Sequence, residues 1–256
     1  MAAVHGVRLL VALAILVFLL VGEPLLGKVA HRQLLAAIAT GKPDVRAPFF
    51  RRWTLRGWAV ALAVLGLSIV VLGFRPSELG VRRPRFSLGL DGGFLAGFAI
   101  ALAGGVAIGL FFARRAKRAG KPKPKPVIAG GENVLSLLPR TPRERRAFAA
   151  LAVTAGITEE LVWRGFGLAI LLAAFPHLSN PFQIAILGFT FGWAHLYQGW
   201  TGMLATGIFG ALLAGLYIAS GSLLLPMLLH VLIDLRALLL PVEADSSVAA
   251  DDSRAS

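Results

Sequence analysis

Apolar stretches dominate this 256-residue chain and restrict it to folds that a lipid bilayer can hold. About 20 apolar residues cross the hydrocarbon layer as a helix, so the pattern predicts membrane-spanning helices. The stretches lie near residues 8–26, 55–74, 92–112, 147–175, 181–197, 202–219 and 223–240. The fourth stretch is long enough to break near Gly165 or Gly167. We therefore predict an all-α, polytopic transmembrane helix bundle of about 7–8 spans.

The charged residues separate the apolar stretches instead of interrupting them. They make up 15% of the chain, against about 25% in a soluble domain. The net charge of +13 does not indicate nucleic-acid binding, because the Lys and Arg residues lie between apolar segments and the aromatic residues lie inside them. The loops 27–54 and 113–146 are richer in Lys and Arg than 75–91. The positive-inside rule then predicts that both face the cytoplasm, with the N-terminus outside a prokaryotic plasma membrane.

The chain divides into three parts by composition. Residues 1–140 are expected to form N-terminal transmembrane helices and basic cytoplasmic loops, and 141–241 to form a catalytic transmembrane core. The Ala-, Ser- and Asp-rich residues 242–256 predict a disordered tail. Further expectations are an interfacial helix over His31–Thr40, an extended spacer at the Lys-Pro tract 121–126, and solvent-exposed side chains at His5, His31 and His177.

Six ionisable side chains lie inside the apolar stretches of the last part. A charge at bilayer depth costs at least ~2.5–3.5 kcal/mol, so such residues are rare and usually share a polar cavity. They fall in three short motifs, each with four-residue helical spacing. The motifs are Glu159-Glu160-x-x-x-Arg164, Phe191-x-x-x-His195 and His230-x-x-x-Asp234.

The spacing within each motif predicts a division of roles. Glu160 and Arg164 share a helix face and are expected to pair, whereas Glu159 is rotated by about 100° and points into the cavity. A carboxylate placed there suits a general base that acts on water. Asp234 lies one turn from His230 and is expected to orient its imidazole ring.

Two versions of a hydrolytic site fit these residues. In the first, Glu159, His195 and His230 bind a zinc ion with one open position for water, since the chain has no cysteine to supply a thiolate. In the second, Glu159 and His195 activate water without a metal. His230 and a protonated or hydrogen-bonded Asp234 then face the developing oxyanion. The sequence is compatible with both.

Taken together, the three motifs resemble those of the CAAX-protease and bacteriocin-processing (CPBP, Abi) family of intramembrane proteases. The resemblance covers about 145–240. It implies an intramembrane endopeptidase whose site opens to the cytosolic side, and whose eukaryotic relatives trim the last three residues from prenylated proteins. Carried onto this chain, Glu159 activates water, His195 assists it or binds metal, and His230 with Asp234 completes the site. Glu160 and Arg164 support them. Many relatives have Asn at the position of Asp234.

The expected substrate is a peptide or protein at the membrane, lipidated or not. Two other functions use the same residues. A proton-coupled transporter would use the buried acids as a relay, and a non-catalytic immunity or scaffold protein would need none of the chemistry.

Overall fold

The computed structural model describes residues 2–84, 93, 96–97 and 130–240, and over these ranges the regular structure is entirely helical. The all-α prediction is confirmed for this part of the chain. The predicted span 92–112 lies almost wholly outside the described residues. The Lys-Pro tract 121–126 and the predicted tail 242–256 lie outside them entirely.

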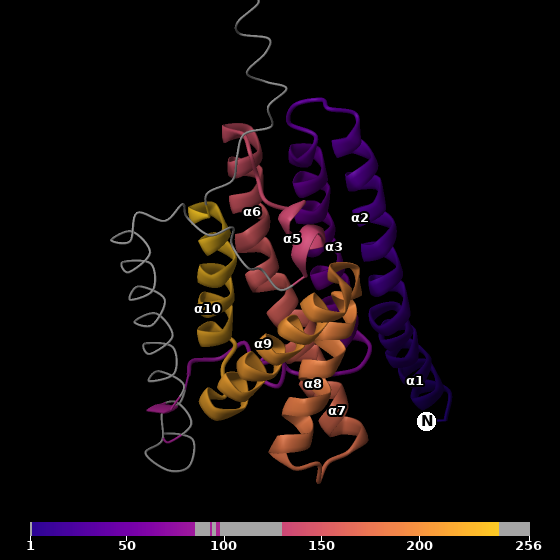
Figure 1. The fold of residues 1–256 in the computed structure, drawn as a ribbon. Coiled ribbons are helices and arrows are strands. Elements are labelled where there is room, and N and C mark those ends of the chain that lie inside the picture. Colours follow the sequence, from indigo (N-terminus) through magenta and orange to yellow (C-terminus); the bar gives the residue numbers. More distant parts are fainter. Residues whose placement is uncertain (1, 85–92, 94–95, 98–129, 241–256) are drawn as a thin grey trace, which may run out of the picture.

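The N-terminal helix is a single run from Ala2 to Ala39 (Figure 1). It consists of α1 (Ala2–Val17), a π-helical turn (Phe18–Gly22) and α2 (Glu23–Ala39). Pro24, in the first turn of α2, has no N–H to donate to the carbonyl of Leu20 four residues earlier. Trp193 Nε1 donates to that carbonyl instead, over 2.8 Å, and so ties the π-helical turn to a later helix.

This run corrects two expectations. The first apolar stretch does not end at residue 26, and His31–Thr40 is not a separate interfacial helix, because α2 continues without interruption to Ala39. His31 is also not solvent-exposed. Its side chain is buried, and its Nε2 lies 3.1 Å from both the Asn133 carbonyl and Ser136 Oγ.

The next helices are α3 (Arg46–Val70), α5 (Gly131–Leu135) and α6 (Pro142–Glu159). The start of α6 is fixed by its sequence, since Thr141 Oγ1 caps the helix by accepting from the backbone N–H of Glu144. The Glu144 side chain is buried and accepts the backbone N–H groups of Arg46 and Arg140. This carboxylate therefore holds the starts of α3 and α6 together.

A π-helical segment (Glu160–Phe166) connects α6 to α7 (Gly167–Ala174). The long fourth stretch therefore changes from α-helix to π-helix in the region where a break was expected, near Gly165 or Gly167. The chain continues through α8 (Asn180–Ala194), a 3₁₀ turn (Leu196–Gln198), α9 (Gly199–Ser220), α10 (Leu224–Leu235) and a last 3₁₀ turn (Arg236–Leu239).

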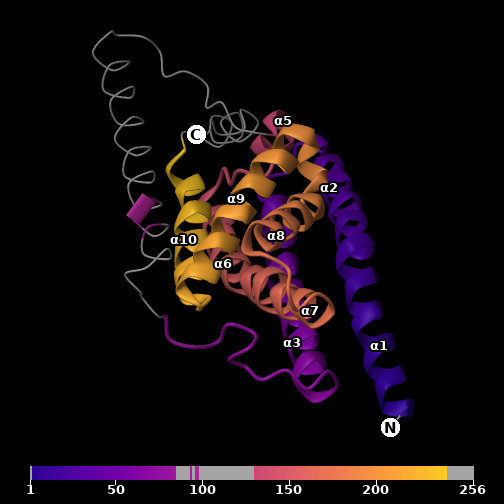
Figure 2. The ribbon, with the colours of Figure 1, turned by 90° about the horizontal axis from the view of Figure 1, so that it is seen from below.

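Helix α6 lies between α3 and α10, and α8 packs along α9 (Figure 1). Figure 2 shows the run α1–α2 along the outside of the bundle. Close backbone approach is possible because glycines face the neighbours. A Cβ on Gly156 would lie 2.7 Å from the backbone nitrogen of Val231 in α10. Glu159 lies about one turn after Gly156, and His230 directly precedes Val231, so this contact holds the two site residues near each other.

Three described helices are long and apolar enough to cross a membrane: His5–Ala39, Arg46–Val70 and Leu196–Ser220. Many large apolar side chains on the outside of the bundle are exposed, as lipid contact requires, among them Leu10 at 69% and Val70 at 83%. The chain is therefore an integral membrane protein, although the 7–8 spans of the prediction are not confirmed.

Candidate active site

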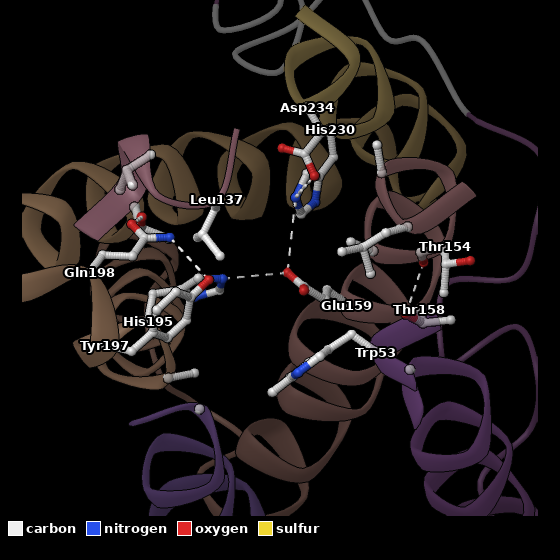
Figure 3. A pocket seen from close by; sticks show the side chains of 18 of the residues that line it. Trp53, Leu137, Thr154, Thr158, Glu159, His195, Tyr197, Gln198, His230 and Asp234 are labelled. Atoms are coloured by element: carbon white, nitrogen blue, oxygen red, sulfur yellow. Dashed lines mark hydrogen bonds and ion pairs between the residues drawn. The ribbon is translucent and has the colours of Figure 1, made fainter. Parts of the chain in front are cut away.

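A cavity of about 760 Å³ opens between α2, α3, α6, α8, α9 and α10. Its polar wall contains four of the predicted residues, Glu159, His195, His230 and Asp234 (Figure 3). Its apolar wall includes Phe49, Phe50, Leu137, Phe148 and Leu151. The structure thus brings the side chains of these four residues, from three separate helical segments, to one cavity.

Glu159 is the last residue of α6 and lies at the centre of the polar group. Its Oε2 lies 3.8 Å from His195 Nε2 and 3.9 Å from His230 Nε2. The side chain is 30% exposed, on the surface of the cavity. As expected from its rotation along the helix, it points into the cavity, toward His195 and His230.

Glu160 and Arg164 form the predicted ion pair, with 2.8 Å between Arg164 Nη1 and Glu160 Oε1, and both side chains are fully buried. The pair has a third member that the sequence did not indicate. His230 Nδ1 lies 2.8 Å from the same Oε1. Because a carboxylate paired with arginine has no hydrogen to give, Nδ1 is the donor in this bond.

Arg164 extends from the pair toward α8 and α9. Its Nη2 donates to the Gly210 carbonyl over 3.2 Å, and its guanidinium lies 3.9 Å from the ring centroid of Phe191. The Phe191 ring in turn lies 4.6 Å from the His195 ring and 5.9 Å from the His230 ring. Phe191 therefore packs against both histidines and the arginine.

His195 caps the end of α8, where the chain leaves the helix. Its Nδ1 lies 2.8 Å from the Phe191 carbonyl. Since a carbonyl only accepts, Nδ1 carries the hydrogen and, in the neutral ring, Nε2 presents a lone pair. That lone pair faces Glu159 across the cavity.

Asp234 is one turn beyond His230 on α10, and its Oδ2 lies 3.7 Å from His230 Nε2. It is 32% exposed and lines the cavity. The structure thus places Asp234 on the same side of His230 as Glu159, opposite the bond to Glu160.

The candidate zinc ligands converge, but their separations do not match a bound metal. Two donors at about 2.0–2.1 Å from a tetrahedral zinc lie about 3.3 Å apart, and Glu159 is farther than that from both rings. In the part of the chain that the structure describes, no three His, Asp or Glu side chains form a metal-binding group.

Several cavity residues were not predicted from the sequence. Tyr197 and Gln198 follow His195 in the 3₁₀ turn, and both line the cavity. Glu23 and Arg56 also line it and form an ion pair of 2.9 Å. The sequence does give one indication of this pair, because Glu23 is a carboxylate inside the first apolar stretch. Trp163, which lies within the first motif, also lines the cavity.

Comparison with known proteins gives one family. Residues 143–236 match the family model described as Type II CAAX prenyl endopeptidase Rce1-like, which confirms the resemblance that the three motifs carry. A search of curated proteins found no match. A search of solved structures found none either.

Proposed function

We propose that this membrane protein is an intramembrane endopeptidase in which Glu159 and His195 activate water, because residues 143–236 match the model of the CAAX prenyl endopeptidase family. One observation carries the proposal. Glu159 Oε2 and His195 Nε2 face each other at 3.8 Å on the cavity surface, and both atoms are hydrogen-bond acceptors. Polar atoms at such a separation are commonly bridged by water. A water molecule here would donate one hydrogen to each.

The reaction follows from this placement. The water oxygen attacks the carbonyl carbon of the scissile peptide bond while Glu159 accepts a proton, and the π electrons move onto the carbonyl oxygen. When the tetrahedral intermediate collapses, the C–N bond breaks and Glu159 returns its proton to the leaving amine. The products are a carboxylic acid and an amine, and Glu159 ends as it began.

The remaining motif residues position the reacting groups. Glu160 and Arg164 neutralise each other in a fully buried site, and Glu160 also holds the His230 ring. Phe191 packs against both histidines. We assign His230 and Asp234 to the side of the cavity where the carbonyl oxygen develops charge.

The zinc-assisted version is the second form of this proposal. The donor separations do not fit a metal in the arrangement described, and none of the steps above passes through one. Metal analysis separates the two forms.

The substrate we propose is a peptide segment with an apolar anchor, lipidated or not. The apolar wall formed by Phe49, Phe50, Phe148 and Leu151 supports this, because it offers a water-poor surface beside the polar group. We propose that the site opens to the cytoplasm, as the distribution of Lys and Arg predicts.

The test is a cleavage assay in proteoliposomes that contain the purified full-length protein. Prenylated and unprenylated C-terminal peptides are incubated with wild type and with Glu159→Gln, and the products are analysed by mass spectrometry. Cleavage by wild type alone supports the proposal. Proton flux without cleavage would indicate the transporter instead, and equal cleavage by the variant would overturn the role of Glu159.

A further inference from the structure

A second cavity, of about 520 Å³, lies where the 3₁₀ turn before α9 packs against α2. It is separate from the active-site cavity, although His31 and Tyr197 line both. Two cations and two indoles distinguish it, and none of them lines the active-site cavity. They are Lys28, Arg32, Trp193 and Trp200.

The two cations lie on one helix face. Lys28 and Arg32 are four residues apart on α2, and both side chains are exposed. Neither has an ion-pair partner in the part of the chain that the structure describes. No described Asp or Glu lines the cavity either. The cavity therefore presents two positive charges to a ligand.

The aromatic side of the cavity is built from fixed side chains. Trp193 Nε1 donates to the Leu20 carbonyl over 2.8 Å. His31 is buried, and its Nε2 lies 3.1 Å from the Asn133 carbonyl. The Tyr197 ring lies 5.7 Å from the His31 ring. These contacts set the shape of the cavity before a ligand binds, as is usual for binding sites.

The cavity lies beside two exposed apolar helix faces. On α2, Leu25 is 57% exposed and precedes Lys28 by three residues, so both are on one face. On α9, Leu204 is 63% exposed and follows Trp200, itself 72% exposed, by four residues. Lys28 is the first cation after the apolar stretch 8–26, and indoles are enriched at membrane surfaces. This arrangement is typical of the level of the lipid headgroups.

We propose that this cavity binds the headgroup of an anionic phospholipid, with Lys28 and Arg32 on its phosphate and the acyl chains along Leu25 and Leu204. Two cations favour a headgroup with net negative charge over a zwitterionic one, whose own cation competes for the phosphate. Arg32 can donate two parallel hydrogen bonds to phosphate oxygens, and Lys28 adds a point charge. The apolar faces favour a lipid over a free phosphate ion, because they can contact acyl chains.

Native mass spectrometry of the purified, delipidated full-length protein tests the proposal. The probes are dioleoyl phosphatidylglycerol, dioleoyl phosphatidylcholine and inorganic phosphate. We expect wild type to bind its first phosphatidylglycerol molecule at least about fivefold more tightly than phosphatidylcholine. Each basic residue contributes about fivefold to the affinity for an anionic lipid surface, so Lys28→Gln/Arg32→Gln should bind phosphatidylglycerol about 25-fold more weakly.

The matched control is Arg51→Gln/Arg52→Gln. These two cations are exposed on α3 and line neither cavity. The affinity of this control for phosphatidylglycerol should stay within about twofold of wild type, because only general surface charge is lost. An equal loss of affinity in the two double variants would overturn the proposal, since the lipid would then respond to surface charge and not to the cavity.

Two other results would also overturn it. Equal affinity for phosphatidylcholine would show that the cations select no headgroup. Displacement of phosphatidylglycerol by inorganic phosphate, but not by chloride at the same ionic strength, would make free phosphate the ligand. If the double variant does not fold, Lys28→Gln alone decides, with an expected loss of about fivefold, and an unchanged affinity contradicts the proposal. Cleavage does not enter these measurements, so their outcome is independent of the proposed protease function.

Discussion

His230 Nδ1 lies 2.8 Å from Glu160 Oε1, the same oxygen that accepts Arg164 Nη1. This contact joins the first and third sequence motifs, which are 70 residues apart. It fixes the orientation of the His230 ring, so that Nε2 faces Glu159 and Asp234. The supporting acid of one motif thus positions the histidine of another.

Replacing Glu160 should therefore affect both folding and activity. In Glu160→Ala the buried Arg164 loses its counter-charge, which costs about 3–5 kcal/mol in the free energy of unfolding. Thermal unfolding in detergent measures this loss. The matched control is Glu132→Ala, because Glu132 is an exposed acid on α5. Equal stability of the two variants would contradict the role of the buried cluster.

The part of the site that lies within single helices was predictable from the sequence. Spacing of four residues predicted the pair Glu160–Arg164 and the turning of Glu159 away from it, because both depend only on helix geometry. The contact between His230 and Glu160 joins two helices, and no local spacing encodes it.

The errors have a similar origin. His31 was expected to be exposed because it lies in the predicted loop 27–54, but it is buried where α5 docks against α2 through Asn133 and Ser136. The first helix was expected to end near residue 26, because the apolar stretch that predicted it ends there. Trp193 instead satisfies the carbonyl that Pro24 leaves unpaired, and the helix continues. Both outcomes depend on residues more than 100 positions away.

A methyl group at Gly156 should separate α6 from α10. The added Cβ would lie 2.5 Å from Val231 Cγ2 and 2.7 Å from its backbone nitrogen, so the backbone of α10 must shift. Since α10 carries His230, we expect Gly156→Ala to lower kcat by about tenfold or more, in line with the sensitivity of catalysis to small displacements. The assay is peptide cleavage at saturating substrate.

The matched control for this variant is Gly66→Ala in α3, where a Cβ meets nothing within 4 Å. Alanine there should leave activity unchanged and raise stability by up to about 1 kcal/mol, because alanine is the better helix former. Similar activity of the two alanine variants would show that the α6–α10 contact does not position the site.

Removing the helix cap at Thr141 should change stability without changing the chemistry. Thr141→Ala loses the bond that the backbone N–H of Glu144 donates to Thr141 Oγ1, and such a loss costs about 0.5–2 kcal/mol. Thr141 is not among the cavity residues. Thermal unfolding should therefore report a lower Tm, while kcat of the folded protein stays within twofold. A large loss of kcat would contradict this prediction and would show that the start of α6 contributes to catalysis.

Metal removal separates the two forms of the proposed mechanism. Since Glu159 and the two histidine rings are spaced too widely for one zinc in the arrangement described, we expect cleavage to survive dialysis against a zinc chelator. Elemental analysis of the purified protein accompanies the assay. Activity that disappears on chelation and returns with stoichiometric zinc would establish the zinc-assisted form instead.

The turnover of Glu159→Gln is the most direct test of the account. The amide keeps the size and position of the side chain in the cavity but cannot accept the water proton, and a general base contributes about 10²–10⁴-fold. We predict that kcat falls by at least 10²-fold while Tm stays within a few degrees of wild type. Cleavage at the wild-type rate by the folded variant would contradict the central role of Glu159.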